Sequence, residues 1–288
     1  MPKADPSMLI DLHTHSSVSD GTQTPTQLMR AAVAAELDVV ALTDHDSTAG
    51  WQEAMTAASG TGVLLIPGIE LSTRIQYASV HVLGYLFDPL DAEIVAETAR
   101  IRDGRLHRAE RIVERLAVDY DLTWDDVLAQ SSMGATIGRP HIADALVARG
   151  HVPNRSAAFA SMLHWRTGYV EPHYAPSPRD GIRMIAEAGG VPVLAHPATH
   201  GRSSVVAESH LRELIDVGLA GLEIGHRENT EAGRAQLRRY AEKYDLIVTG
   251  SSDYHGDGKP NRLAENSTAP DQLERILTLG SGSEPFQG

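Results

Sequence analysis

The sequence contains no cysteine among its 288 residues. A chain without thiols cannot form disulfides, cannot build a thiolate zinc site and cannot use a cysteine nucleophile. Any metal that this protein binds must therefore be held by nitrogen and oxygen ligands, which histidine, aspartate and glutamate supply.

Long apolar runs are also missing. No stretch approaches the roughly 18 apolar residues of a transmembrane helix, and the polar residues 1–7 offer no apolar region of the length that a signal peptide needs. We expect a protein that does not bind a membrane and that acts in the cytoplasm. The sequence also lacks a Gly-x-Ser-x-Gly motif, so serine-hydrolase chemistry has little support.

Positive charge is scarce, because 25 Lys and Arg stand against 38 Asp and Glu, which gives a net charge of −13. A broad groove for duplex DNA needs clustered lysine and arginine, so we expect no duplex DNA among the partners. A small phosphorylated substrate, such as a nucleotide or short RNA, remains compatible with a few local cations. No segment indicates a protein partner.

What the sequence does contain is an alternation of strand and helix patterns. Short β-branched and aliphatic runs predict strands at residues 8–15, 39–43, 63–71, 79–87, 191–195, 221–225 and 246–251. Helical patterns lie between most of these runs, with start signals such as Thr24-Pro25. The alternation predicts an α/β barrel whose functional side chains lie at the carboxyl ends of its strands.

The middle of the chain has a different, helical texture. Charged amphipathic or helical patterns cover residues 91–120, 124–130, 140–149 and 156–164, and no convincing strand interrupts them. We therefore expect a first part of the barrel at 1–90, a helical insertion at 91–174 and a second part of the barrel at 175–288. The last residues, 281–288, are expected to fray.

Histidines and carboxylates follow the predicted strands repeatedly. His13 and His15 form a His-x-His pair whose imidazoles lie on one face, because strand side chains alternate with a period of two. Glu70 and Asp253 end later strands, and such carboxylates can bridge two neighbouring ions. The candidate metal ligands are His13, His15, Asp20, His45, Glu70, His81, His196, Asp253 and His255. Alternatively, these are satisfied polar residues at strand ends, with Asp44 and Asp253 capping the following helices.

The sequence resembles the polymerase-and-histidinol-phosphatase (PHP) superfamily of metal-dependent phosphoesterases. The resemblance spans nearly the whole chain and lies in the motifs Asp-Leu-His-Thr-His-Ser with Ser-Asp-Gly behind it, Leu-Thr-Asp-His-Asp, Pro-Gly-Ile-Glu, Ala-His-Pro and Ser-Ser-Asp-Tyr-His. It implies a distorted (β/α)7 barrel with two or three divalent metal ions, manganese preferred and zinc or iron as alternatives. By resemblance, the ligand sets are His13, His15, Glu70 and Asp253 for one ion, Glu70, His81 and His196 for a second, and Asp20, His45 and His255 for a third.

The insertion resembles one branch of this superfamily, through residues 136–143, 157–159 and 168–170. That branch contains phosphatases for 3',5'-bisphosphonucleotides and exonucleases that trim short RNA from its 5' end. The resemblance implies hydrolysis of a nucleotide phosphate ester here. A phosphatase for histidinol phosphate or another small phosphomonoester is the alternative, and a non-enzymatic metal-binding scaffold is a further one.

Four residues are candidates for substrate binding. Arg139 and His141 precede a predicted helix, and the planar guanidinium of Arg139 suits a second phosphate. A simple helix start with an exposed arginine is the alternative. Arg166 is a weaker candidate in a charged segment, and His226 is equally compatible with a role behind the metal ligands or with simple exposure.

Catalysis is expected to depend on Glu70, Asp253 and His196. The two carboxylates would orient a water shared between two ions, and His196 or His226 would assist the leaving oxygen. The other histidines are expected at the surface; they are His107, His151, His164, His173, His200 and His210.

Overall fold

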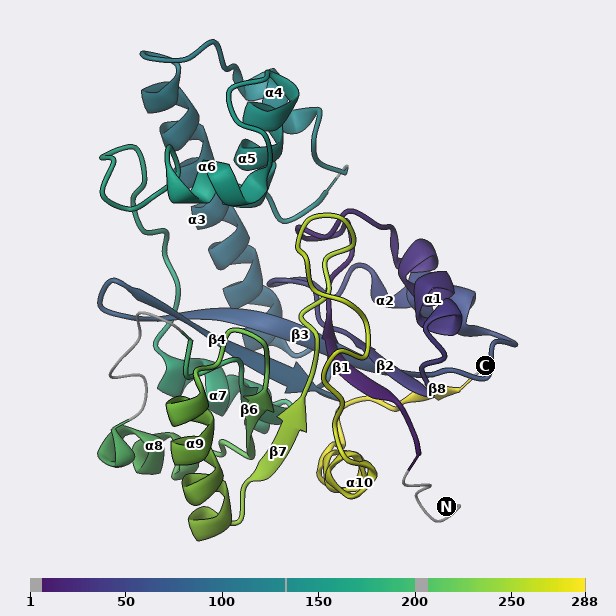
Figure 1. Ribbon diagram of the computed structural model, residues 1–288. Helices are drawn as coiled ribbons and strands as arrows, with labels where there is room; N and C mark the ends of the chain where they lie inside the picture. The colour runs from purple at the N-terminus through teal and green to yellow at the C-terminus, as the bar shows by residue number, and fades with distance from the viewer. Residues whose placement is uncertain (1–6, 133, 200–206, 288) are drawn as a thin grey trace.

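Short runs of buried β-branched and aliphatic residues form the central sheet (Figure 1). The structure is a computed structural model and describes residues 7–132, 134–199 and 207–287. Neighbouring strands of the sheet follow one another in chain order. They are β1 (Ile10–Thr14), β2 (Val39–Leu42), β3 (Leu64–Ile75), β4 (Ala78–Tyr85), β5 (Val191–Leu194), β6 (Gly221–Gly225) and β7 (Ile247–Gly250).

The two ends of the sheet, β1 and β7, meet through the segments that follow them. Thr14 and Tyr254 form a parallel bridge, and the His15 N–H donates to the Tyr254 carbonyl over 2.8 Å. The sheet is therefore a nearly closed barrel, which confirms the predicted α/β class.

Strand β4 runs against both of its neighbours, whereas the other neighbouring pairs among β1–β7 are parallel. It follows β3 through a tight hairpin at Gln76 and Tyr77, so no helix separates these two strands. The sequence analysis placed no helix between these two strands either, but it did not predict that β4 is reversed. Because β4 is reversed, its first residues lie at the rim formed by the last residues of its neighbours. His81, near the start of β4, reaches the rim for this reason.

Helices cover the outside of the barrel. Figure 1 shows α1 and α2 on one side, α7, α8 and α9 on the other, and α10 below. Their bounds are α1 (Pro25–Ala34), α2 (Trp51–Ala58), α7 (Pro178–Glu187), α8 (Glu208–Ile215), α9 (Glu231–Tyr244) and α10 (Pro270–Leu279). Alternate strand residues separate two apolar clusters, because successive side chains point to opposite faces. Val40 and Leu42 pack with the outer helices, while Val39 and Ala41 pack with residues of α10.

The remaining helices lie above the barrel in Figure 1. They are α3 (Ala92–Leu116), α4 (Trp124–Leu128), α5 (Arg139–Ala148) and α6 (Arg155–Ala160). They surround an apolar cluster of their own, with Ile112 and Leu146 fully buried in it. Within the described residues of 91–174 there is no strand. The division of the chain into barrel and insertion stays a prediction that this packing supports. Among the helices of the described residues, none has the length and apolar character required to cross a bilayer.

The end of the chain differs from the expected frayed tail. Strand β8 (Phe286–Gln287) pairs antiparallel with the first residues of β3, with Phe286 opposite Leu65. Phe286 also packs against the apolar cluster between the sheet and its helices. The expectation for 281–288 was wrong because this short segment adds to the exposed edge of β3; Gly288 lies outside the described residues.

Tyr85 offers a test of the barrel interior. Its side chain is fully buried, and its hydroxyl donates to the Leu12 carbonyl over 2.9 Å. Tyr85→Phe leaves the ring in place but removes this donor, so we expect the free energy of unfolding to fall by about 1–2 kcal/mol. Urea denaturation measures the change, with Tyr77→Phe as the control because Tyr77 is exposed. Equal midpoints for both variants would contradict the expectation.

Candidate metal centre and active site

The predicted metal ligands meet at one rim of the barrel. His13 belongs to β1, Glu70 lies in the middle of β3 and His81 lies near the start of β4. The others follow a strand: His15 and Asp20 come after β1, His45 after β2, His196 after β5, and Asp253 and His255 after β7. Each of the nine has a ring nitrogen or carboxylate oxygen within 4 Å of another member of the set.

Three residues of this rim have left-handed backbone conformations. They are Asp46, His196 and Asp253, with φ of 53°, 30° and 56°. A non-glycine residue in a sparsely populated backbone region costs of the order of 1–3 kcal/mol, and such residues concentrate at functional sites. Surrounding hydrogen bonds hold these turns; for example, the His196 N–H donates to Glu223 Oε2 over 2.8 Å. The strain supports a functional role for the rim.

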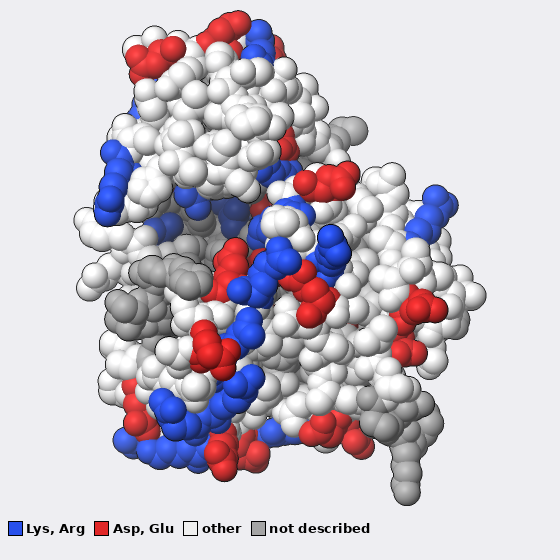
Figure 2. Space-filling model, in the orientation of Figure 1, with Lys and Arg blue, Asp and Glu red and all other residues white. Residues whose placement is uncertain are grey.

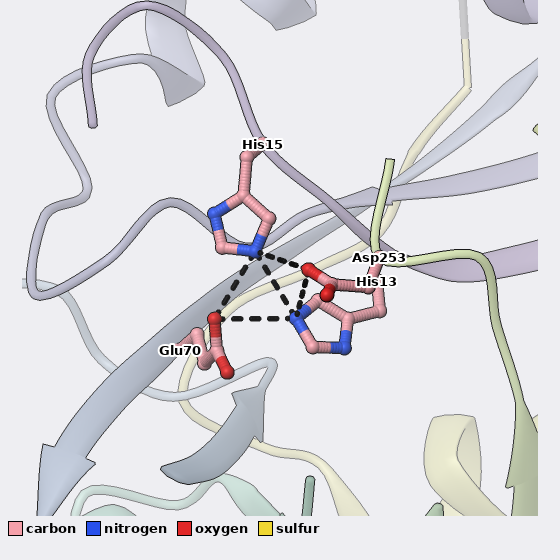
Figure 3. Close-up of side chains that lie close together, drawn as sticks. All are labelled: His13, His15, Glu70 and Asp253. Atoms are coloured by element: carbon pink, nitrogen blue, oxygen red, sulfur yellow. Dashed lines mark hydrogen bonds and ion pairs between the residues drawn. The ribbon is translucent and has the colours of Figure 1, made fainter. Parts of the chain in front are cut away.

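Four of the candidate ligands form a compact group, shown in Figure 3. His13 Nε2 lies 3.1 Å from His15 Nε2, 3.2 Å from Glu70 Oε2 and 3.5 Å from Asp253 Oδ1. His15 Nε2 lies 3.1 Å from Glu70 Oε2 and 3.3 Å from Asp253 Oδ1. All four ligand atoms lie within 4.8 Å of one another, and all four residues are buried.

This group suits a divalent cation. Atoms that bind one zinc ion tetrahedrally at about 2.0 Å lie about 3.3 Å from one another, and the five distances above are of this size. Two imidazoles and two carboxylates are also a donor set that zinc, iron and manganese accept. The donor set and its spacing therefore suit a metal ion.

A second group surrounds the other oxygen of Glu70. Glu70 Oε1 lies 2.7 Å from His81 Nδ1 and 3.2 Å from His196 Nε2. His81 Nδ1 is buried, and within the described chain it has no partner in hydrogen-bonding geometry. A ring nitrogen that lies near a carboxylate without aligning for a proton is expected where both groups share a cation. The ligand atoms that lie within 4.8 Å of one another here belong to His45, Glu70 and His81, so the expected place of His196 in this set stays a prediction.

The third group gathers around Asp20. Asp20 Oδ1 lies 3.1 Å from His255 Nε2 and 3.8 Å from His15 Nδ1, and Asp20 Oδ2 lies 3.9 Å from His45 Nε2. The other nitrogen of His45, Nδ1, lies 3.2 Å from Glu70 Oε2. His45 therefore lies between the group of Asp20 and the group of Glu70, and it could bind a cation in either group.

The pKa values of the rim residues are shifted because carboxylates and imidazoles lie close together and are buried. Burial opposes the charge of Glu70, but His45, His81 and His13 outweigh it and hold the pKa of Glu70 well below its usual range. Burial likewise opposes the charge of His15, but Asp253 and Glu70 outweigh it and raise the pKa of His15 to about 9. A cation would take the place of protons on these rings, since metal ligands must be unprotonated.

The sequence analysis assigned no role to Glu223, whose carboxylate contacts His13 of the four-residue group. Its side chain is fully buried in β6, and Glu223 Oε1 lies 3.0 Å from His13 Nδ1. A carboxylate on one ring nitrogen keeps the proton there and leaves the other nitrogen free to bind a metal. The same carboxylate also accepts from the His196 N–H. The one sequence signal was an acidic residue inside an otherwise apolar strand pattern.

A cavity of about 1300 Å³ opens beside the rim, between the barrel and helices α3, α5 and α6. Figure 2 shows it as a hollow with Lys and Arg side chains on its wall. Asp20, His45, His81 and His255 line one part of it. The other part is lined by a group that we call the arginine cluster, which consists of Arg74, Arg105, Arg108 and Arg139.

The arginine cluster carries more positive charge than its surroundings neutralise. Arg105 binds Asp46, with Nε 2.8 Å from Oδ2, and donates to Ser72 Oγ over 2.6 Å. Arg108 is 6% exposed, and in the described residues its Nε has no hydrogen-bond partner. Burial, together with Arg105, Arg139 and Arg74, holds the pKa of Arg108 well below its usual range. Such a cluster is suited to an anion. Only Arg139 of this cluster was among the candidates from the sequence.

The other substrate-binding candidates do not line this cavity. His141 is buried, and its Nδ1 accepts from the Gly138 N–H over 3.2 Å, so it caps the start of α5. His226 is fully buried behind the rim, with Nε2 3.6 Å from Asp253 Oδ2. Arg166 is exposed and lies over the ring of Trp165, 4.7 Å from its centre.

His173 corrects one expectation about the remaining histidines. It was expected at the surface but is 8% exposed and lines the cavity beside the arginine cluster. Burial, with Arg105 and Arg108, lowers the pKa of His173 to about 2, so the ring is neutral. His200 lies outside the described residues.

Imidazoles and carboxylates in these groups, facing a cluster of arginines across one cavity, define a metal-dependent hydrolase of anionic substrates. The comparisons with known proteins agree. The PHP domain matches residues 11–148. A crystal structure of a candidate metal-dependent phosphoesterase from Bifidobacterium adolescentis superposes with a TM-score of 0.93 and 44% identity, covering 96% of this chain and 98% of that one.

Three curated relatives are similar along most of their length. The chain is 32% identical over 255 residues to the 3',5'-nucleoside bisphosphate phosphatase of Chromobacterium violaceum, which covers 88% of this chain and 89% of that protein. It is 30% identical over 254 residues to the 5'-3' exoribonuclease Rnm of Escherichia coli K12, with coverage of 86% and 85%. It is 31% identical over 260 residues to the phosphoribosyl 1,2-cyclic phosphate 1,2-diphosphodiesterase of Eggerthella lenta, with coverage of 86% and 95%.

The chain belongs to the PHP family and is a metal-dependent phosphoesterase. This confirms the family and the type of enzyme that the motifs predicted.

Glu223→Gln tests the support behind His13. Glutamine keeps the size of the side chain but loses the charge that holds the proton on His13 Nδ1, so we expect metal affinity to fall by roughly 10- to 100-fold. Competition with a chelator measures the affinity, and Glu231→Gln on the exposed start of α9 is the matched control. An unchanged affinity in Glu223→Gln would show that His13 does not need this partner.

Proposed function

We propose that the protein hydrolyses the 3' phosphoester of a nucleotide that also carries a 5' phosphate. Its substrate is a 3',5'-bisphosphonucleotide or the first nucleotide of a short RNA. The observation that carries the proposal is the arginine cluster, which faces the metal-ligand groups across one cavity. Two separated anion-binding places suit a substrate with two phosphates.

One binding mode accounts for both reactions. In each, water attacks phosphorus at the metal side, the bond between phosphorus and the 3' oxygen breaks, and that oxygen leaves with a proton. Both reactions release a nucleoside 5'-monophosphate with a free 3' hydroxyl; the other product is inorganic phosphate from a bisphosphonucleotide and the shortened, 5'-phosphorylated strand from RNA. The 5' phosphate is held by Arg139 and Arg108, whose forked guanidiniums suit phosphate oxygens. The names of two relatives, a nucleoside bisphosphate phosphatase and a 5'-3' exoribonuclease, support this substrate class.

The metal-ligand groups would hold two or three divalent cations, and we prefer manganese over zinc or iron. Such ions supply a nucleophile from water near neutral pH and neutralise charge on the phosphoryl oxygens. Glu70 and Asp253 orient the attack, because their oxygens lie between the groups. His196 and His226 do not line the cavity. We therefore assign both to holding the carboxylates, in place of the expected role at the leaving oxygen. The predicted location remains the cytoplasm.

A substrate panel tests the proposal. The purified protein, loaded in turn with manganese, zinc and iron, is assayed on adenosine 3',5'-bisphosphate, a 5'-phosphorylated short RNA, phosphoribosyl 1,2-cyclic phosphate and histidinol phosphate. We expect the first two to have the highest kcat/KM. A preference for either of the last two would refute the nucleotide substrate, and inactivity on all four would favour a metal-binding scaffold.

Arg139→Ala tests the second phosphate site. We expect KM for adenosine 3',5'-bisphosphate to rise by roughly 10- to 100-fold, as is typical when a charged hydrogen bond is lost. KM for adenosine 3'-monophosphate, which lacks the second phosphate, should change little. Arg212→Ala on the exposed face of α8 is the control. An equal loss on both substrates would contradict the two-site arrangement.

Arg108→Met tests the charge of the cluster in the absence of substrate. Methionine preserves much of the buried volume and removes repulsion from Arg105, Arg139 and Arg74, so we expect the anion-free protein to gain of the order of 1 kcal/mol in stability. Inorganic phosphate should raise the melting temperature of the native protein more than that of the variant. A less stable variant that responds normally to phosphate would contradict this account.

A further inference from the structure

The cavity has an aromatic wall in addition to its charged walls. Tyr77, Phe159 and Trp165 all line it. At about 1300 Å³ it exceeds the roughly 300–1,000 Å³ of ordinary small-molecule pockets, so two phosphate sites do not account for all of its space.

Two of these aromatic side chains are unusually exposed. Tyr77 is 88% exposed and Trp165 is 67% exposed. Trp165 is one of three tryptophans in the chain. Tyr77 lies at the turn between β3 and β4, and Trp165 follows α6. Two separate parts of the fold thus present an exposed ring to the same cavity. Neither ring is needed for a core, so a ligand with an aromatic face is the occupant that their chemistry fits.

The surroundings of Trp165 orient its ring. Arg166 lies over the indole, with its guanidinium carbon 4.7 Å from the ring centre, and the His164 ring lies 5.6 Å away. Deeper in the cavity, Arg139 lies 5.4 Å from the centre of the Phe159 ring. The aromatic wall is therefore continuous with the arginine cluster through Phe159.

We propose that this wall is a nucleobase subsite, in which the base stacks on Trp165 while Tyr77 closes the cavity from the hairpin. The inference rests on the proposed function and deepens it. Stacking uses the face of a ring that every base has, so it tolerates all base identities but requires an unpaired base. The substrate class is then an unpaired nucleotide of any sequence. Arg166 acts through the indole that it covers, which makes it a positioning residue.

The test compares a nucleotide with its abasic counterpart. The substrates are adenosine 3',5'-bisphosphate and the 3,5-bisphosphate of 1-deoxyribose, which keeps both phosphates and lacks the base. For Trp165→Ala we expect KM for the nucleotide to rise about tenfold or more, the size typical of lost base stacking. The kcat and the KM for the abasic compound should stay within about twofold, and Trp165→Phe should recover most of the loss.

Outcomes separate this inference from the function on which it rests. If the native protein hydrolyses neither bisphosphate, the proposed function fails. If it hydrolyses both and Trp165→Ala leaves KM for the nucleotide unchanged, or raises KM equally for the two, the base subsite is wrong. Fluorescence gives a second readout: adenosine 3',5'-bisphosphate should quench emission of the native protein, and Trp165→Phe should abolish that quenching although Trp51 and Trp124 remain. Persistent quenching in this variant would also overturn the proposal.

Discussion

The carboxylate of Glu70 is the group on which the rim depends. Its two oxygens lie within 3.2 Å of a ring nitrogen from each of five histidines, and its side chain is 2% exposed. A buried carboxylate is costly unless charge and hydrogen bonds compensate it. Without a cation, protons on His13 and His15 provide that compensation, because the carboxylates around these two rings raise their pKa. A divalent ion provides it more fully, because it attracts the carboxylates and the ring nitrogens together. Binding a metal would thus offset the free-energy cost of burying the Glu70 carboxylate.

The buried carboxylates of the rim face an excess of positive charge in the cavity, which comes from the arginine cluster. The chain has a net charge of −13, yet four arginines line one cavity. One of them, Arg105, forms an ion pair with Asp46. Burial, and after it the repulsion from neighbouring arginines, lowers the pKa of Arg108 and Arg139. On the proposed function, a substrate with two phosphates would balance both charges, because one phosphate would bind at the metal-ligand groups and the other at the guanidiniums. Electrostatic complementarity of this kind also favours capture of anions by a protein that repels them elsewhere.

The sequence predicted the metal groups better than the substrate cavity, for physical reasons. His13, His15 and Asp253 stand at strand ends, and strand ends converge in a barrel whatever the details of its loops. Arg105 and Arg108 lie on a long charged helix, where an arginine that faces a cavity has the same pattern as one in solvent. The reversal of β4 depends on a two-residue turn, and the pairing of β8 depends on a free sheet edge. Neither leaves a periodic signal in the sequence.

Arginines of the insertion also connect it to the barrel, and this links substrate choice to the metal site. Arg155 of α6 forms a paired hydrogen bond with Asp144 of α5, with both contacts at 2.5 Å, and donates to the Asp20 carbonyl over 3.0 Å. Arg102 of α3 donates to the Asp46 carbonyl over 2.6 Å. The same helices that supply Arg108 and Arg139 to the cavity therefore hold the loops that carry Asp20 and His45. A change in the insertion that displaced the proposed second phosphate site would therefore also act on these loops, through the same hydrogen bonds.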